Sequence, residues 1–504
     1  MGNGAEPQAL DPHLVSGFTE HKILTSLFEG LATLDGTTLE PKPAAAESWT
    51  VSDDGKVYRF TIRENAKWSN GDPVTAHDYV YAWQRNLSPG LGSEYAYMLH
   101  CIWNAKVFNE GRLTDFGQVG ARALDERTLE VTLENPTPYF PAMQIHFSFF
   151  PVHRANIERF GRIDERGTKW TQAGNMVSNG PFLLTKWWPN RIITVAKNPY
   201  YWDANAVRLK EINFYPIDNL QTEELTFRAG GLHVTDAVRK SRLPKFRATM
   251  PQYLRMHPFL GSYFYRFNCA RAPFTDVRVR RAFAMSIDRE LITKNLLHGA
   301  YEPTACFTPP NTAGYTCTAS IPYDVAAAKR LLAEAGFPDG RGLPPVELLF
   351  NTSEEHKLIA EAVQQMWKKN LNASVTLVNQ DWKVYLDALT NMDYYVARSS
   401  WIGDYYDPNS FLDCFLTGGG NNRTGFSDAR YDELIGRAAK TPEQGERYRL
   451  FQEAERILLD QAPIAPIYLY RRVYLRVPEL KGWDENLLGY VIYKNVYFET
   501  CGAK

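Results

Sequence analysis

The segment that most constrains the fold runs from residue 345 to residue 378. Residues 345–351 form a short apolar run typical of a strand, residues 356–370 follow a helical period, and residues 374–378 form a second strand. A strand, a helix and a strand in that order make a β-α-β unit, which has parallel strands and a right-handed crossover. The pattern therefore predicts an α/β fold.

Strand and helix signals also alternate along the rest of the chain. Residues 56–63 and 127–133 alternate apolar and polar side chains, as half-buried strands do. Thr75 and the acidic residue three positions later predict a capped helix start. Residues 276–292 also follow a helical period. At 504 residues the chain has room for about three domains, and we expect two α/β lobes with a cleft between them.

The charge balance argues against two classes of partner. The chain has 56 basic and 57 acidic residues and a net charge of −1, without a basic block. Nucleic acid and anionic membrane surfaces are therefore not expected partners. No apolar run approaches the ~20 residues needed to span a bilayer. Residues 1–7 lack a signal-peptide pattern, so we expect a signal peptide to be absent or already removed.

The residues that usually carry catalysis form no recognisable constellation. The sequence has no nucleophile elbow, no zinc-protease motif, no phosphate-binding loop and no CxxC pair. We therefore expect no enzyme, no catalytic residue, no metal and no cofactor. Cys306 and Cys317 flank a loop rich in Pro, Gly and Thr. They could form a disulfide in an oxidising compartment or remain free thiols, and the sequence leaves both possibilities open.

One short stretch points to binding. Arg398 and Asp404 lie six residues apart after a strand-like run, with Trp401 and Gly403 between them. Six extended residues span about 20 Å, which is the length of a short stretched peptide, itself a zwitterion. An anion and a cation joined by free backbone would bind peptide ends and ignore the side chains. The plain alternative is a buried strand with a helix-capping Asp and a surface Arg.

Several longer motifs resemble the family 5 extracellular solute-binding proteins, and among them the periplasmic oligopeptide-binding proteins. The matching stretches occur in the expected order along essentially the whole chain. They are residues 4–13 (GAEPQALDPH), 27–31 (LFEGL), 46–49 (AESW), 58–71, 73–76, 273–280 (PFTDVRVR), 351–353 and 356–357.

This resemblance implies a two-lobed periplasmic-binding-protein fold of type II, cluster C, that closes on its ligand by a hinge. Lobe I would have a core of residues 1–31, 170–258 and 471–504 and an extra subdomain of residues 32–169. Lobe II would be residues 259–470. The implied role is a periplasmic receptor of a Gram-negative bacterium that captures short peptides and delivers them to an inner-membrane ABC permease. We expect it to be a monomer.

The resemblance also carries over ligand-binding positions one by one. Asp404 matches the carboxylate that pairs with the peptide α-ammonium, and such a buried pair must be well hydrogen-bonded. Arg398 and His356 match positions that meet ligand carboxy-termini. Ser400 and Ile402 would offer backbone groups to the ligand, as in strand addition, and hydrated pockets would tolerate many side chains. The remaining expected ligand-binding residues are Tyr95, Trp382, Trp401, Phe18, Ser16 and Arg266.

Three positions depart from the pattern of the known peptide receptors. Ser16 and Arg266 stand where those receptors have glutamates, and Leu389 replaces an arginine. Leu260 and Ile402 occupy positions where some relatives carry a disulfide, so that bridge is missing. We infer that Arg266 favours a ligand with an acidic group. The alternative is that Arg266 points to solvent or pairs with a carboxylate.

Other functions remain open at this stage. The chain could be a dedicated receptor for an acidic or murein-type peptide. The resembled family also takes nickel chelates, haem, oligosaccharides and other solutes, but Asp404 argues against ligands that lack an α-ammonium. An enzyme or a chaperone-like protein on this scaffold is a further alternative that no residue pattern supports.

Overall fold

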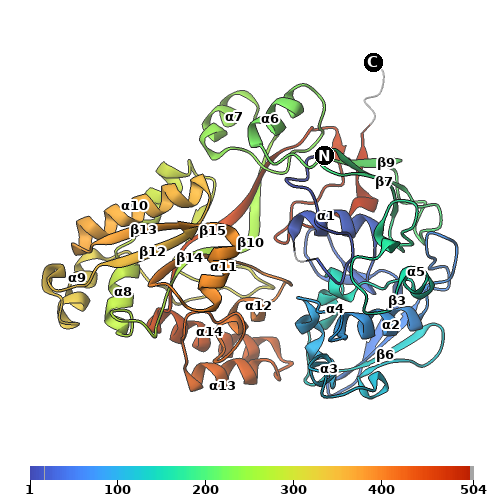
Figure 1. The fold of residues 1–504 in the computed structure, drawn as a ribbon, viewed down its shortest axis with the longest axis horizontal. Coiled ribbons are helices and arrows are strands. Elements are labelled where there is room, and N and C mark those ends of the chain that lie inside the picture. Colours follow the sequence, from blue (N-terminus) through green and yellow to red (C-terminus); the bar gives the residue numbers. More distant parts are fainter. Residues whose placement is uncertain (16, 500–504) are drawn as a thin grey trace. The chain divides into compact units, whose positions relative to one another are not determined.

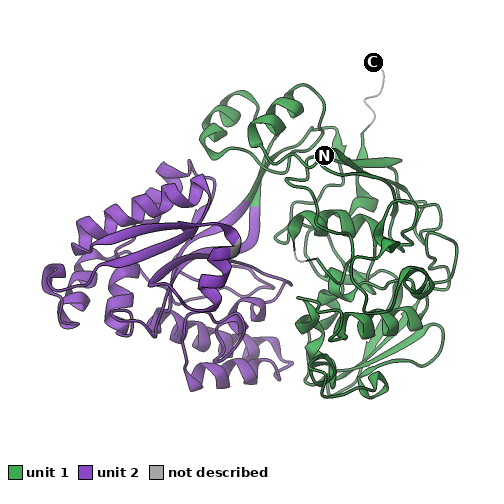
Figure 2. Ribbon diagram, viewed as in Figure 1, with its two compact units in different colours: residues 1–257, 472–504 green, residues 258–471 purple. Residues whose placement is uncertain are grey.

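The computed structural model describes residues 1–15 and 17–499, except the side chain of Lys383. It contains two compact units, unit 1 with residues 1–257 and 472–504 and unit 2 with residues 258–471 (Figure 2). Both units combine helices and strands, as the α/β prediction requires. The expected three-part division of the chain stays a prediction. None of the helices in the described residues is both long and apolar enough to cross a membrane.

Unit 1 contains small, mostly antiparallel sheets. One has the order β3-β4-β6-β5, formed by Ala46–Val51, Val57–Ile62, Thr128–Thr132 and Ala121–Ala123. A second has the order β7-β8-β9, formed by Phe182–Trp188, Ile192–Lys197 and Glu211–Phe214. Two short ribbons pair β1 (Ala32–Leu34) with β2 (Pro41–Pro43), and β16 (Leu480–Lys481) with β17 (Tyr497–Phe498).

The helices of unit 1 are mostly short (Figure 1). At the start of α2 (Ala76–Leu87), Thr75 and Asp78 form the predicted capping box. Each side chain accepts a hydrogen bond from the backbone N–H of the other residue, which would otherwise have no partner. Its buried Arg85 makes a two-pronged ion pair with Asp11, at 2.9 and 2.6 Å. This pair ties the N-terminal segment to α2. The other helices are α1 (Phe18–Leu27), α3 (Ala105–Asn109), α4 (Phe140–Met143), α5 (Arg154–Phe160), α6 (Leu220–Arg228) and α7 (Leu243–Thr249).

Unit 2 is built on a single mixed sheet with the order β11-β15-β10-β14-β12-β13. Parallel β12 (Val346–Asn351) and β13 (Val375–Gln380) flank α10 (Glu354–Leu371), which confirms the predicted β-α-β unit. β14 (Val396–Ile402) pairs antiparallel with β10 (Leu254–Phe267) along its whole length. The remaining strands are β11 (Glu302–Pro303) and β15 (Ile464–Leu475).

The helices of unit 2 bury apolar side chains against this sheet. The Ser353 side chain caps α10, acidic residues occupy its first turn, lysines occupy its last, and Asn372 closes it in a left-handed conformation. Its buried Trp367 donates to the carbonyl of Phe283 at 2.9 Å, which fixes α10 against α8. The helices are α8 (Val277–Met285), α9 (Val325–Glu334), α11 (Trp382–Thr390), α12 (Asn409–Leu412), α13 (Ala429–Ala438) and α14 (Gln444–Gln461).

One local expectation needs correction. The helix predicted over residues 276–292 ends at Met285, because the Ser286 hydroxyl bonds back to the carbonyl of Phe283 at 2.9 Å. A π-helical turn follows at Leu291–Leu296. The missing bridge stays as expected, and in the β10–β14 register Ile402 faces Gly261, which is next to Leu260. The cross-strand position opposite Ile402 therefore has no side chain.

Cys306 and Cys317 are free thiols in this structure. Both sulfurs donate to the same acceptor, the carbonyl oxygen of Ala319, at 3.1 and 3.4 Å. Two thiols that share one acceptor lie in the same part of the loop, and the hydrogen bond from Cys317 is the largest cause lowering the pKa of Cys306.

Candidate functional site

The most distinctive feature of unit 2 is an open edge on β14. Along the neighbouring β12, only Val396 and Ala397 have strand partners, whereas β10 pairs with every residue from Val396 to Ile402. On the β12 side, no described strand pairs with residues 398–402. An unpaired strand edge is a template for an added strand. This five-residue stretch is therefore a place where extended chain can bind.

The direction of the backbone groups follows from one side-chain contact. The Tyr385 hydroxyl on α11 donates to the carbonyl of Arg398, so this carbonyl points away from β10. Residues in an antiparallel pair alternate between facing the partner and facing away from it. The backbone groups of Ser400 and Ile402 therefore point to the open edge, as the sequence analysis expected. The amide of Gly403 points the other way, to the carbonyl of Leu260 at 2.8 Å.

Arg398 lies at the first end of this edge. Its side chain is buried, which excludes the surface Arg of the plain alternative. The guanidinium donates to Asn351 at 3.3 Å and to the Tyr470 hydroxyl at 3.1 Å, and it lies 4.9 Å from the ring centre of Tyr263. Its Nε has no hydrogen-bond partner. The neutral partners leave the positive charge of Arg398 able to bind a carboxylate.

His356 lies beside this cation. Its ring is 5.6 Å from the ring of Tyr263, so His356 and Arg398 contact the same tyrosine. Burial and then the charge of Arg398 lower the pKa of His356 to about 3. The imidazole is thus neutral near pH 7 and adds hydrogen-bonding capacity without more positive charge. The structure therefore brings together the two residues predicted to meet ligand carboxy-termini.

Asp404 lies just beyond the other end of the edge. Its backbone N–H donates to the Ser410 hydroxyl at 2.8 Å, which fixes the turn after β14. Burial, and then the charge of Asp404, raise the pKa of Asp413 to about 7. Two carboxylates that disfavour each other's ionisation make a strong site for a cation. Asp404 caps none of the described helices, so the capping role of the plain alternative is not found.

The two tryptophans of the predicted set lie in different surroundings. Trp401, on β14, donates its indole N–H to the carbonyl of Ser410 at 2.5 Å and is held in place. Trp382, at the start of α11, is 56% exposed and stacks on Tyr385 with ring centres 5.5 Å apart. Tyr385 in turn bonds to the carbonyl of Arg398. Trp382 is therefore an exposed aromatic ring that is linked through Tyr385 to the Arg398 end of the β14 edge.

Arg266, on β10, is buried and only 7% exposed. Its Nη2 donates to the Ser399 hydroxyl at 2.5 Å, while its Nε and Nη1 have no hydrogen-bond partner. No carboxylate of the described residues lies within the 4.0 Å of an ion pair. Neither alternative raised from the sequence, exposure to solvent or pairing with a carboxylate, is found. The nearby Leu389 is part of the buried core.

In unit 1, Phe18 and Tyr95 belong to one aromatic cluster. His21 stacks on Phe18 at 6.3 Å between ring centres and lies 6.5 Å from His146, which lies 4.8 Å from Tyr95. Burial lowers the pKa of both histidines, so they are neutral rings near pH 7. Two cations lie over the ring of Phe18, Lys22 at 5.7 Å and Arg472 at 4.9 Å from the ring centre, so the Phe18 end of the cluster is positively charged. Ser16 lies outside the described residues.

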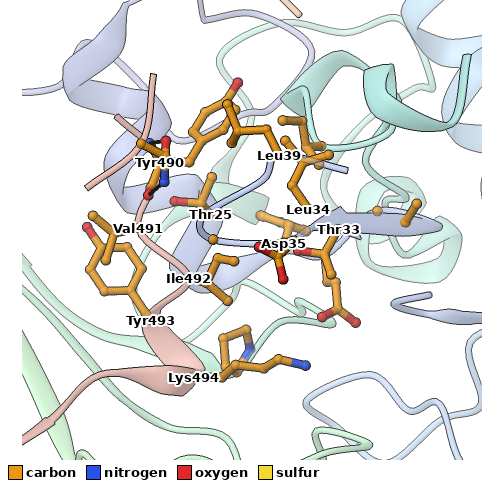
Figure 3. Close-up of a pocket in the computed structure, with 18 of the residues that line it drawn as sticks. Thr25, Thr33, Leu34, Asp35, Leu39, Tyr490, Val491, Ile492, Tyr493 and Lys494 are labelled. Atoms are coloured by element: carbon orange, nitrogen blue, oxygen red, sulfur yellow. Dashed lines mark hydrogen bonds between the residues drawn. The ribbon is translucent and has the colours of Figure 1, made fainter. Parts of the chain in front are cut away.

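Unit 1 also holds a cavity that the sequence analysis did not predict (Figure 3). The space open to the centre of a water molecule is about 70 Å³. Asp35, Ile492 and Lys494 are among its lining residues, and no residue of the predicted site is. Its half-buried Glu29 already accepts hydrogen bonds from the Tyr201 hydroxyl and, at 2.6 Å, from the Trp202 indole. This cavity therefore has no unpaired charge to bind a ligand.

Sequence reasoning missed the neutral groups that hold Arg398, because no single motif identifies them. Tyr263 and Tyr470 come from β10 and β15, two strands far apart in the chain. The only signal was the aromatic run from residue 263 to 265 in a strand next to Arg266. A run of aromatic residues in a central strand also suits an ordinary core, so this run did not distinguish the two roles.

Comparisons with known proteins agree on one family. Residues 40–423 match the model of the bacterial extracellular solute-binding proteins, family 5. The oligopeptide-binding protein OppA of Bacillus subtilis (strain 168) is 37% identical, and the match covers 98% of this chain and 91% of OppA.

Solved structures give the same result for the fold. The murein tripeptide binding protein MppA of Escherichia coli is 37% identical, with a TM-score of 0.86 over 99% of this chain and 97% of that one. OppA of Haemophilus influenzae, in complex with the peptide RPPGFSPFR, is 32% identical with a TM-score of 0.82, over 99% and 98% of the two chains.

Proposed function

The chain belongs to the family 5 bacterial extracellular solute-binding proteins, and we propose that it captures short peptides for an ABC importer. The observation that carries this proposal is the open edge of β14 with a cation at one end and carboxylates at the other. A peptide in extended conformation would add a strand here and hydrogen-bond to the backbone of Ser400 and Ile402. Recognition through the backbone supports binding of many sequences.

The charges at the two ends match the two termini of a peptide. Asp404, with Asp413 nearby, binds the α-ammonium, and Arg398, with His356, binds a carboxylate. Both ends are partly buried, where charge-assisted hydrogen bonds are stronger than in water. Trp401 and Trp382 flank the edge and contact ligand side chains. Ligand binding needs no chemical step, so the protein acts as a receptor and not as an enzyme.

The proposed role extends to the setting of the protein. The receptor works in the periplasm of a Gram-negative bacterium and hands its peptide to an inner-membrane permease. It acts as a monomer, and the ligand contacts expected of Phe18 and Tyr95, both in unit 1, stay a prediction. Closure of the two lobes on the ligand stays a prediction.

The first experiment is mass spectrometry of the small molecules released when the purified protein is denatured. A ladder of short peptides of mixed sequence is the expected result. One dominant acidic or D-amino-acid peptide would instead point to a dedicated receptor. A non-peptide solute would refute the assigned ligand class and leave the family membership intact.

A second experiment tests the strand-addition geometry directly. Methylation of a single backbone nitrogen in a bound tripeptide removes one N–H donor and leaves the charges unchanged. We expect a loss of affinity at the nitrogen that faces Ser400 or Ile402 and almost none at its neighbour, because alternate residues of a strand face alternate sides. Equal affinities for all the methylated peptides would contradict binding along this edge.

A further inference from the structure

Among the buried arginines of the described residues, Arg266 has the fewest hydrogen bonds. Arg85 and Arg447 each grip a carboxylate with two bonds, of 2.9 and 2.6 Å and of 2.7 and 2.6 Å. Arg280 and Arg289 donate to several backbone carbonyls. Arg266 donates to one hydroxyl and leaves two of its nitrogens without a partner. A buried charge left this way is costly unless something else pairs with it.

A second arginine, Arg423, adds positive charge next to Arg266. Arg423 lies near Arg266. Burial is the main cause that lowers the pKa of the Arg423 guanidinium, and the positive charge of Arg266 lowers it further. Arg423 also has no ion pair to a carboxylate of the described residues within 4.0 Å. The tyrosines around Arg266 cannot neutralise it, since Tyr385 and Tyr394 already donate their hydroxyls to backbone carbonyls. Among the described residues, therefore, no carboxylate pairs directly with Arg266 or Arg423.

Arg266 and Arg398 are positioned for different anions. In the β10–β14 register Arg266 faces Ala397, and its guanidinium reaches Ser399. Successive side chains of a strand point to opposite faces, so Arg398 lies on the opposite face from Ser399. A single carboxylate cannot bind both arginines. A peptide strand added at the open edge, however, points its side chains alternately to both faces, and one set lies on the face of Arg266.

The position along the edge can also be limited. In the register of β10 with β14, Arg266 faces Ala397, and its guanidinium contacts Ser399. Ser399 is next to Arg398 and five residues before Asp404. Because Arg398 is the proposed partner of the ligand carboxy-terminus, the group bound by Arg266 belongs near the carboxy end of the ligand.

We propose that Arg266, with Arg423 beside it and Ser399 as its anchor, forms a second anion site that selects a side-chain carboxylate near the carboxy end of the bound peptide. The proposal rests on the peptide-binding function given above and deepens it. It makes the receptor general for backbone and termini but selective for acidic side chains at one position. The required ligand is a short peptide that contains Glu, Asp or an equivalent acid.

The test measures affinities by titration calorimetry for three pairs of tripeptides, with Glu or the isosteric Gln at position one, two or three and Ala elsewhere. The carboxy-terminus is amidated in a parallel set, so that a terminal carboxylate cannot account for a preference. The wild-type protein is expected to prefer Glu over Gln at one position by at least about tenfold, the scale of a charge-assisted hydrogen bond. Equal affinities at all three positions overturn the proposal while the peptide-binding function stands. No binding of any tripeptide overturns both.

Two variants assign the preference to its residue. Arg266→Met is expected to remove the Glu preference and to keep the affinity for the Gln peptides. Because it removes an unpaired buried charge, it should not lower the melting temperature. Arg271→Met removes a more exposed arginine from the same region and should keep the preference. A Glu preference that persists in Arg266→Met overturns the assignment, and the wild-type comparison decides the proposal if the variant does not fold.

A last measurement separates a peptide side chain from a free anion. Acetate alone is added to wild-type protein and to Arg266→Met, and the melting temperature is followed. Acetate stabilisation that depends on Arg266, together with a Glu preference in the tripeptides, supports the site. Acetate stabilisation without any Glu preference shows that the site takes only free anions, which overturns the side-chain proposal.

Discussion

Replacement of Asp404 by Asn keeps the shape of the side chain and removes its charge at the end of the β14 edge. At an effective dielectric constant near 20, an ammonium about 3 Å from a carboxylate gains about 5 kcal/mol before desolvation is subtracted. Charge-assisted hydrogen bonds measured in proteins retain about 1.5–3 kcal/mol of such a gain. Because the nearby Asp413 can take up part of the role, we expect a net loss of about 2–3 kcal/mol, or about 30- to 150-fold in affinity.

The assay is a double-mutant cycle that combines this variant with acetylation of the peptide amino-terminus. Acetylation removes the ammonium, so the variant should weaken free peptides strongly and acetylated peptides hardly at all. Asp339→Asn, at a position 81% exposed in the same unit, is the matched control and should change neither affinity. If Asp404→Asn weakened the free and acetylated peptides equally, the assignment of Asp404 to the α-ammonium would be wrong.

Three further changes test other parts of the structure. Peptide affinity should rise from about pH 5 to about pH 7, because the pKa of Asp413 is about 7 in the free protein and a bound ammonium lowers it. Dissociation constants measured across this pH range should change less in Asp413→Asn. Dissociation constants of the wild type that do not change with pH would contradict the reasoning. Arg447→Met leaves Asp407 buried without its two-pronged partner and should cost about 3–5 kcal/mol in urea unfolding, whereas an unchanged midpoint would show that the pair adds nothing. Treatment with oxidised glutathione should join Cys306 and Cys317, with loss of two hydrogen atoms by intact mass and a gain of about 3 kcal/mol in stability; Cys306→Ser is the control, and an unchanged wild-type mass would refute the pairing.

The sequence alone identified the local elements and the kind of ligand. The β-α-β unit around α10 follows from periodicity and capping, which depend on neighbouring residues only. The capping box of Thr75 follows for the same reason. The spacing of Arg398 and Asp404 on a strand suggested a zwitterionic ligand, because strand geometry fixes the distance between them.

Other features were decided by contacts between distant segments. The open edge exists because β12 pairs with β14 at only two residues, and nothing within β14 encodes where its neighbour ends. The partner of Ile402 proved to be Gly261, since register depends on the whole ladder.

Arg266 shows the same division most clearly. Its sequence neighbours allowed exposure, a carboxylate partner or a ligand, and all three were chemically reasonable. Burial without a carboxylate partner depends on Ser399 and on the charge of Arg423, which reach Arg266 from strand and loop segments more than a hundred residues away. Local sequence determines which elements form and which charges they carry. Only the packing of distant elements decides which of those charges stay unpaired, because burial and pairing are properties of the assembled sheet.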